Sequence, residues 1–231
     1  MLRVALLCLL MSVSASLRAA PKVEDSIAQR VQACTGCHGA QGRAASDGYQ
    51  PRIAGKPAGY LYHQLLNFRD GHRQYQPMVR LIDPLSDAYL REMAAYFASL
   101  DLPYPPPQAA TAPAETLKRG EALALRGDST RRIPACVQCH GPALTGLAPA
   151  IPGLLGLPRD YLNAQLGAWQ TGNRRAQSPD CMAQVAQSLS ADDVAALSQW
   201  LAAQPLPTNT KAVGVLPSPL PVPCGGVEAQ R

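Results

Sequence analysis

Two short motifs place cysteine and histidine at identical spacing, 102 positions apart. Both read Cys-x-x-Cys-His: the first contains Cys34, Cys37 and His38, and the second contains Cys136, Cys139 and His140. Two cysteines three positions apart on a helical turn can form thioethers with the two vinyl groups of a haem, while the adjacent imidazole reaches the iron. The motifs therefore predict two covalently attached haem c groups, each with a histidine ligand.

Two other chemistries also use closely spaced cysteines. A thioredoxin-like redox pair needs a βαβ setting, and the sequence has no alternating strand pattern to supply one. A zinc site could use the four cysteines, but it would leave the two identically placed histidines without a role. Zinc remains the minor alternative to haem.

Each haem iron needs a second axial ligand, and methionine or histidine are the usual choices in electron carriers. Met182 is the one methionine of residues 114–204, and His140 is the one histidine there. The two halves of the sequence resemble each other, and this similarity aligns Met78 with Met182. The competing residues pair with side chains that cannot bind iron: Met93 with Leu197, His63 with Ala164 and His72 with Asn173. We therefore expect His38 with Met78 and His140 with Met182, with Met93 in a core and both other histidines solvated or facing haem propionates.

The similarity between the two halves extends beyond these motifs. The segment 51–55 resembles 149–153, and Tyr60-Leu61 with Gly71-His72-Arg73 recurs 101 positions later as Tyr161-Leu162 with Gly172-Asn173-Arg174. Small changes in offset are what loop insertions between shared elements produce. The chain is predicted to be a tandem duplication.

Helical patterns account for every element that we expect in each half. They cover about 24–33 and 115–125, then 60–69 and 161–170, and a last helix begins after Ser86 and after Ser190. Both serines are N-cap candidates, and Asp193 stands at the capping-box position relative to Ser190. The sequence therefore predicts an all-α fold.

Composition divides the chain further. An apolar run in residues 1–20, after Arg3, is too short to span a bilayer and predicts a secretory signal peptide, with an uncleaved anchor as the alternative. Proline-rich stretches at 103–113 and 205–231 predict a linker and a tail around domains at 21–102 and 114–204. We expect no transmembrane segment in the mature chain and a periplasmic location.

The net charge of +5, from 21 basic and 16 acidic residues, is spread without long basic runs. A nucleic-acid partner is therefore not expected.

Removal of Cys8 with the signal and use of four cysteines for haem leave Cys181 and Cys224, which we expect to form a disulfide in an oxidising compartment. Cys181 is expected on a loop next to Met182.

The paired order of these elements resembles the dihaem cytochrome c4 family over about residues 22–204. This resemblance implies two tandem class I cytochrome c domains, each around one haem. It also suggests that the carbonyls of Pro51 and Pro149 accept a hydrogen bond from the ligating imidazoles. The second half departs from the family at Leu157, where a polar residue is expected, and the proline-rich tail is unusually long.

Two six-coordinate irons would leave no place for a substrate, so we expect an electron carrier and not an enzyme. Its expected partners are a redox donor and, from the resemblance, a terminal acceptor such as a respiratory oxidase. Two alternatives remain open at this point. One is a haem subunit docked on a periplasmic dehydrogenase or sulfur-oxidising enzyme, and the other is a dihaem peroxidase with one displaceable ligand.

Overall fold

The computed structural model describes residues 24–44, 48–214 and 219–227. The predicted signal peptide, residues 1–20, lies outside this part. No helix in the described ranges is long and apolar enough to cross a membrane.

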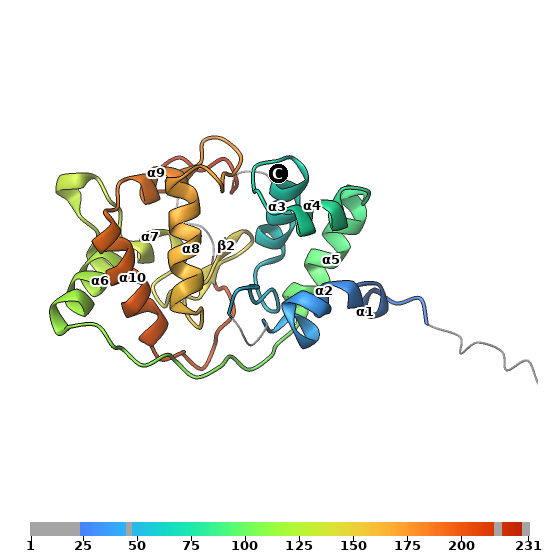
Figure 1. Ribbon diagram of the computed structural model, residues 1–231, viewed down its shortest axis with the longest axis horizontal. Helices are drawn as coiled ribbons and strands as arrows, with labels where there is room; N and C mark the ends of the chain where they lie inside the picture. Colours follow the sequence, from blue (N-terminus) through green and yellow to red (C-terminus); the bar gives the residue numbers. More distant parts are fainter. Residues whose placement is uncertain (1–23, 45–47, 215–218, 228–231) are drawn as a thin grey trace, which may run out of the picture.

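Figure 1 shows two groups of helices, with the first half of the chain (residues 24–102) on the right and the second half (residues 114–204) on the left. The first half contains α1 (Ile27–Arg30), α2 (Gln32–His38), a 3₁₀ turn η1 (Ala40–Gly42), α3 (Ala58–Arg69), α4 (Gln76–Ile82) and α5 (Asp87–Ser99). The second half contains α6 (Ala114–Arg126), a 3₁₀ turn η2 (Ser129–Arg131), α7 (Cys136–His140), β1 (Gly146–Leu147), β2 (Ile151–Pro152), α8 (Arg159–Gln170), α9 (Cys181–Gln187) and α10 (Ala191–Ala203).

The last helix of each half begins at the predicted serine. The Ser86 hydroxyl accepts a hydrogen bond from the Tyr89 N–H at 3.3 Å. Ser190 accepts from the Asp193 N–H at 3.1 Å, and the Asp193 carboxylate accepts from the Ser190 N–H at 2.9 Å, which completes a capping box. Both N-cap predictions are confirmed.

The structure differs from the predicted elements in three respects: a divided helix, two additional short helices and a short strand pair. The expected helix at 24–33 is divided at Val31, where the chain leaves α1 and begins α2. Short helices α4 and α9 were not expected, and Cys181 begins α9 instead of lying on a loop. Strands β1 and β2 pair antiparallel, with Gly146 opposite Pro152. Two residues per strand are too few to produce an alternating pattern in the sequence.

Each half packs its own apolar core. In the first half α3 and α5 supply the centre, with Leu90 fully buried and Phe97 beside it. In the second half α6 crosses α10 closely at Gly120, because a Cβ there would lie 2.2 Å from the Ala196 carbonyl oxygen. A larger residue at 120 could not keep this helix crossing.

Residues 100–113 join the two halves without helix or strand. The Arg52 guanidinium donates hydrogen bonds to the carbonyls of Leu102 and Pro103, and it lies 3.8 Å from the centroid of the Tyr104 ring. Further along, the Gln108 N–H donates to the Ala202 carbonyl at 2.9 Å. The connecting segment is therefore held by both halves.

Candidate haem sites

Each half of the chain contributes its cysteine motif to a different cavity. The first cavity, of about 580 Å³, is lined by Cys34, Cys37, His38 and Met78. The second cavity, of about 460 Å³, is lined by Cys136, Cys139, His140 and Met182. The structure thus divides the four cysteines into two pairs, each with a histidine and a methionine, and does not bring them together as a four-cysteine zinc site would require.

Short helices hold the two histidines. His38 ends α2 and His140 ends α7, and both are buried. Nδ1 of His38 lies 2.8 Å from the Pro51 carbonyl oxygen, as predicted. A carbonyl can only accept, so Nδ1 carries the proton and Nε2 is left free to bind iron. Burial lowers the pKa of both histidines, which favours the neutral imidazole that metal binding requires.

The prediction for Pro149 is wrong. Nδ1 of His140 instead lies 2.7 Å from the carbonyl oxygen of Pro152. The Pro149 carbonyl accepts a hydrogen bond from the Gly59 N–H at 3.1 Å, at the start of α3 in the other half. The correct repeat offset is therefore 101, which aligns Pro51 with Pro152 and the Pro-x-Ile-x-Gly-x-Pro of 51–57 with the Pro-x-Leu-x-Gly-x-Pro of 152–158.

The methionines occupy matching places in the two cavities. Met78 lies in the first turn of α4 and Met182 in the first turn of α9. Met93 also lines the first cavity, but it is buried in the core with Leu90 and Phe97. His63 and His72 line the second cavity and not the first. Ligation by Met78 and Met182 remains our prediction.

Three of the four motif cysteines are partly buried in apolar surroundings, while Cys37 is exposed. Burial raises the pKa of the Cys34 and Cys139 thiols, and raises the pKa of the Cys136 thiol to about 11. Neutral sulfurs beside an apolar cavity fit thioether attachment.

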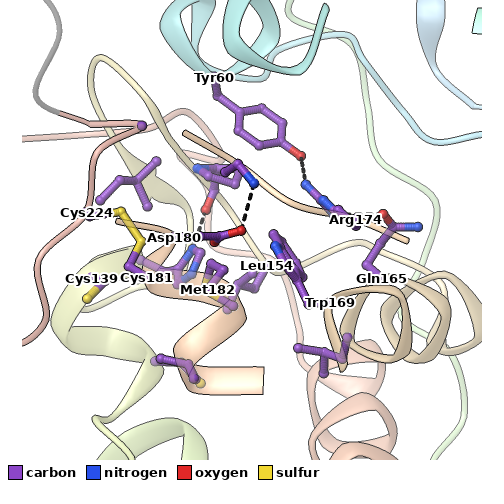
Figure 2. A pocket seen from close by; sticks show the side chains of 18 of the residues that line it. Tyr60, Cys139, Leu154, Gln165, Trp169, Arg174, Asp180, Cys181, Met182 and Cys224 are labelled. Carbon is purple, nitrogen blue, oxygen red and sulfur yellow. Dashed lines mark hydrogen bonds between the residues drawn. A yellow bond between two sulfur atoms is a disulfide. The ribbon is translucent and has the colours of Figure 1, made fainter. Parts of the chain in front are cut away.

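A polar network joins the two cavities at the boundary between the halves. Arg73 donates to Oε1 of Gln64 at 3.0 Å and to Oε1 of Gln165 at 2.9 Å. Arg174 donates to the same two oxygens, at 2.9 and 2.7 Å. Arg174 also stacks on the indole of Trp169, with its Cζ 3.7 Å from the ring centroid (Figure 2). We did not predict this network, although all four of its members recur at the 101 offset that marks the repeat.

The cavities also present buried charge that needs a partner. Arg52, Lys56 and Arg174 are each at most 6% exposed, yet within the described ranges none forms an ion pair with a carboxylate. The buried Trp169 Nε1, which lines the second cavity, finds no acceptor among the described residues. Burying unpaired charge is costly. Two anionic propionates per haem would satisfy these groups, so the residues present fit two haems.

The second cavity is covered by the end of the chain. A disulfide joins Cys181 to Cys224, which are 43 positions apart, as predicted (Figure 2). Leu220, Val222 and Val227 from the tail line the same cavity. The disulfide therefore holds the tail residues near Met182, which follows Cys181 in the chain.

Comparison of the sequence with known proteins shows the family to which the chain belongs. No family model matches the chain. The thiosulfate dehydrogenase electron acceptor of Thiomonas intermedia (strain K12) is 39% identical over 83% of this chain and 88% of its own. Cytochrome c4 of Pseudomonas aeruginosa is 34% identical over 73% of this chain and 82% of its own. The chain belongs to the cytochrome c4 family.

Solved structures of similar proteins agree. Reduced recombinant cytochrome c4 from Pseudomonas stutzeri superposes with a TM-score of 0.66 at 31% identity, covering 77% of this chain and 96% of that one. The thiosulfate dehydrogenase (TsdBA) of Marichromatium purpuratum gives 0.64 at 37% identity; its match covers 75% of this chain but spans only 36% of that longer chain. As a member of the cytochrome c4 family, the protein has two tandem class I cytochrome c domains, holds two covalent haem c groups and transfers electrons.

Proposed function

We propose that the protein is the electron acceptor of a periplasmic dehydrogenase that oxidises a reduced sulfur compound such as thiosulfate. One observation carries the proposal: the match to the thiosulfate dehydrogenase electron acceptor of Thiomonas intermedia, which covers 88% of that relative. A haem subunit that stays docked on the dehydrogenase would accept electrons in the same way, within a stable complex. Electrons would leave singly toward a terminal acceptor such as a respiratory oxidase.

The chain's own residues would perform three tasks in this role. His38 and His140, fixed by the carbonyls of Pro51 and Pro152, would each supply one ligand to an iron, and Met78 and Met182 would each supply a second. When bound, haem supplies reversible one-electron exchange, and a thioether opposite an imidazole favours the ferrous state. Six-coordinate irons leave no open position, which supports a carrier and not an enzyme.

Arg73 and Arg174 would assist electron exchange between the two haems. Arg73 and Arg174 lie between the cavities and share the same pair of glutamine oxygens. Fixed donors at this boundary would hold both haems' propionates in one orientation without side-chain rearrangement on reduction. A rigid polar boundary of this kind suits fast electron exchange between the haems, because little reorganisation accompanies each transfer.

Location is part of the proposal. Thioether-bound haem and a disulfide both fit an oxidising compartment outside the cytoplasm. The apolar run in residues 1–20 supports export. We therefore place the protein in the periplasm, where it would meet both donor and acceptor.

Rapid mixing tests the donor directly. The oxidised holoprotein is mixed with a purified thiosulfate dehydrogenase and thiosulfate, and haem absorbance is followed; omission of thiosulfate is the control. We expect both haems to become reduced, which takes two electrons per chain, at a rate that depends on dehydrogenase concentration. A dehydrogenase that turns over with ferricyanide but leaves this protein oxidised would overturn the proposal. Peroxide turnover with a high-spin haem signal would instead favour the peroxidase alternative.

A further inference from the structure

Lys56 occupies a position at which the two halves differ. The 101 offset pairs it with Leu157. The structure supports this pairing. The preceding residues, Gly55 and Gly156, both have positive φ, 74° and 68°. Helix α3 begins two residues after Lys56, and α8 begins two residues after Leu157. The duplicated segment therefore carries a cation in one copy and an aliphatic side chain in the other.

The Lys56 side chain extends out of its own half. It lines the second cavity, although its backbone belongs to the first half. Its Nζ donates to the Gly153 carbonyl at 3.3 Å, one residue after the Pro152 carbonyl that fixes His140. The residue is only 6% exposed. A buried positive charge therefore lies beside the wall that positions the second histidine.

The surroundings of Lys56 leave its charge uncompensated by protein. Burial, and secondarily the nearby Arg52 cation, lowers the pKa of Lys56 to about 8. The Tyr104 ring centroid lies 5.9 Å from Nζ. Among the described residues, no carboxylate pairs with Lys56.

The two cavities are lined by different cations. Leu157 is buried and lines the second cavity, the same one as Lys56. Lys56 is absent from the lining of the first cavity, while Arg52 and Arg174 line both. Arg30 and Arg73 line only the first cavity, and Lys56 is the one lysine or arginine among the described residues that lines only the second.

We propose that Lys56 is a tuning residue that raises the reduction potential of the second haem, acting across the boundary from the first half. Reduction adds one negative charge to a haem, and a fixed positive charge in a low-dielectric wall stabilises the added electron. The same charge, kept away from the first cavity, would bias the electron toward the second haem. This role does not depend on which donor the protein serves.

Redox titration of the holoprotein tests the proposal. The potentials of both haems are measured at pH 6.5 for wild type, Lys56→Gln, Lys56→Arg and the surface control Lys118→Gln. The second haem is assigned as the one whose potential moves in Met182→Ala. We expect Lys56→Gln to lower the constant for moving an electron from the first haem to the second at least threefold. At 59 mV per tenfold for one electron, this is roughly 30 mV.

The controls separate charge from packing. Lys56→Arg should keep the wild-type potentials, and Lys118→Gln, which removes the same charge from an exposed site, should leave the difference between the haems unchanged. Equal shifts of both haems in Lys56→Gln, no shift of the second, or an arginine variant that behaves like glutamine would each overturn the proposal. If Lys56→Gln fails to retain haem, Lys56→Met provides the same comparison.

Discussion

Each cavity is lined by its own half and by residues of the other half, and the second is lined by the tail as well. Exposed apolar side chains, Tyr49 at 65% and Leu81 at 41%, line the first cavity. The second is bounded by the hairpin β1–β2, by a tail held through Cys224, and by Lys56 from the other half. Duplication thus preserved the haem-binding motifs and changed what surrounds them. Differences between the haems should arise from these surroundings.

The supporting helices differ in the same sense. In the second half the helix before the cysteine motif, α6, has 13 residues and crosses α10 at Gly120, while the helix before the motif in the first half, α1, has four. The last helix also differs: Asp193 is fully buried between two arginines, whereas Asp87 in the first half is half exposed. The second half should therefore lose more stability from single substitutions.

The largest expected effect is loss of a methionine ligand. Axial ligands set haem potentials over about 0.8 V, and we expect Met78→Ala or Met182→Ala to lower the potential of one haem by on the order of 0.1–0.3 V. Each variant should remove half of the sulfur-to-iron charge-transfer absorption. Met78→Ala with that absorption intact would mean that another residue, such as Met93, binds the first iron.

Removal of the disulfide should destabilise the second half alone. In the chain-entropy model, closure of a loop of this length stabilises by about 4 kcal/mol, and the haem already constrains part of it, so we expect Cys224→Ser to cost about 2–4 kcal/mol. Denaturant unfolding followed at each haem measures this. The double variant with Cys181→Ser should lose no more than the single one. Equal loss in both halves would argue against a local effect of the tail.

The helix crossing gives the next effect. Gly120→Ala places a Cβ against the backbone of α10 and should cost about 1–3 kcal/mol through forced separation of α6 and α10. Gly167→Ala, within α8 with no atom close to the added Cβ, is the matched control and should be neutral or stabilising by about 0.5–1 kcal/mol. Similar destabilisation by both would refute the close-crossing explanation.

Asp193 should make the second half sensitive to acid. Burial raises its pKa, but hydrogen bonds from Arg131, Ser190 and Arg119 outweigh burial and hold the pKa at about 2. Since the carboxyl titrates near 3.9 when unfolded, its contribution of about 2 kcal/mol is complete above pH 4 and is lost as pH falls toward 2. We expect Asp193→Asn to remove this pH dependence.

The half-exposed Asp87 provides the comparison. Although its pKa is also lowered, through hydrogen bonds from Arg69 and Tyr62, solvent screens these interactions. Asp87→Asn should therefore cost less stability than Asp193→Asn. Urea midpoints of both variants between pH 2 and 7 measure the contrast, and a larger loss for Asp87→Asn would reverse our ranking of the two halves.

Features that depend on local sequence could be predicted. The cysteine motifs and the capping box at Ser190 follow from residue type and spacing, and the structure contains them. The Cys181–Cys224 disulfide follows from the two cysteines that haem attachment and the signal peptide leave over. Features set by contacts between the halves could not be. The contact of Pro149 is one such feature, because its carbonyl accepts a hydrogen bond from Gly59 of the other half. The role of Lys56 likewise depends on the cavity that its side chain reaches. The acceptor for His140, in contrast, could have been predicted, because the 101 offset aligns Pro152 with Pro51.

Proton NMR of the fully reduced holoprotein tests most directly whether each half holds one haem between a histidine and a methionine. The ring current of a haem shifts the methyl group of a bound methionine far outside the range of an unbound one. We predict two such methyl resonances per chain, of which Met78→Ala removes one and Met182→Ala the other. A single shifted methyl in the wild-type protein, or none, would contradict paired His–Met ligation.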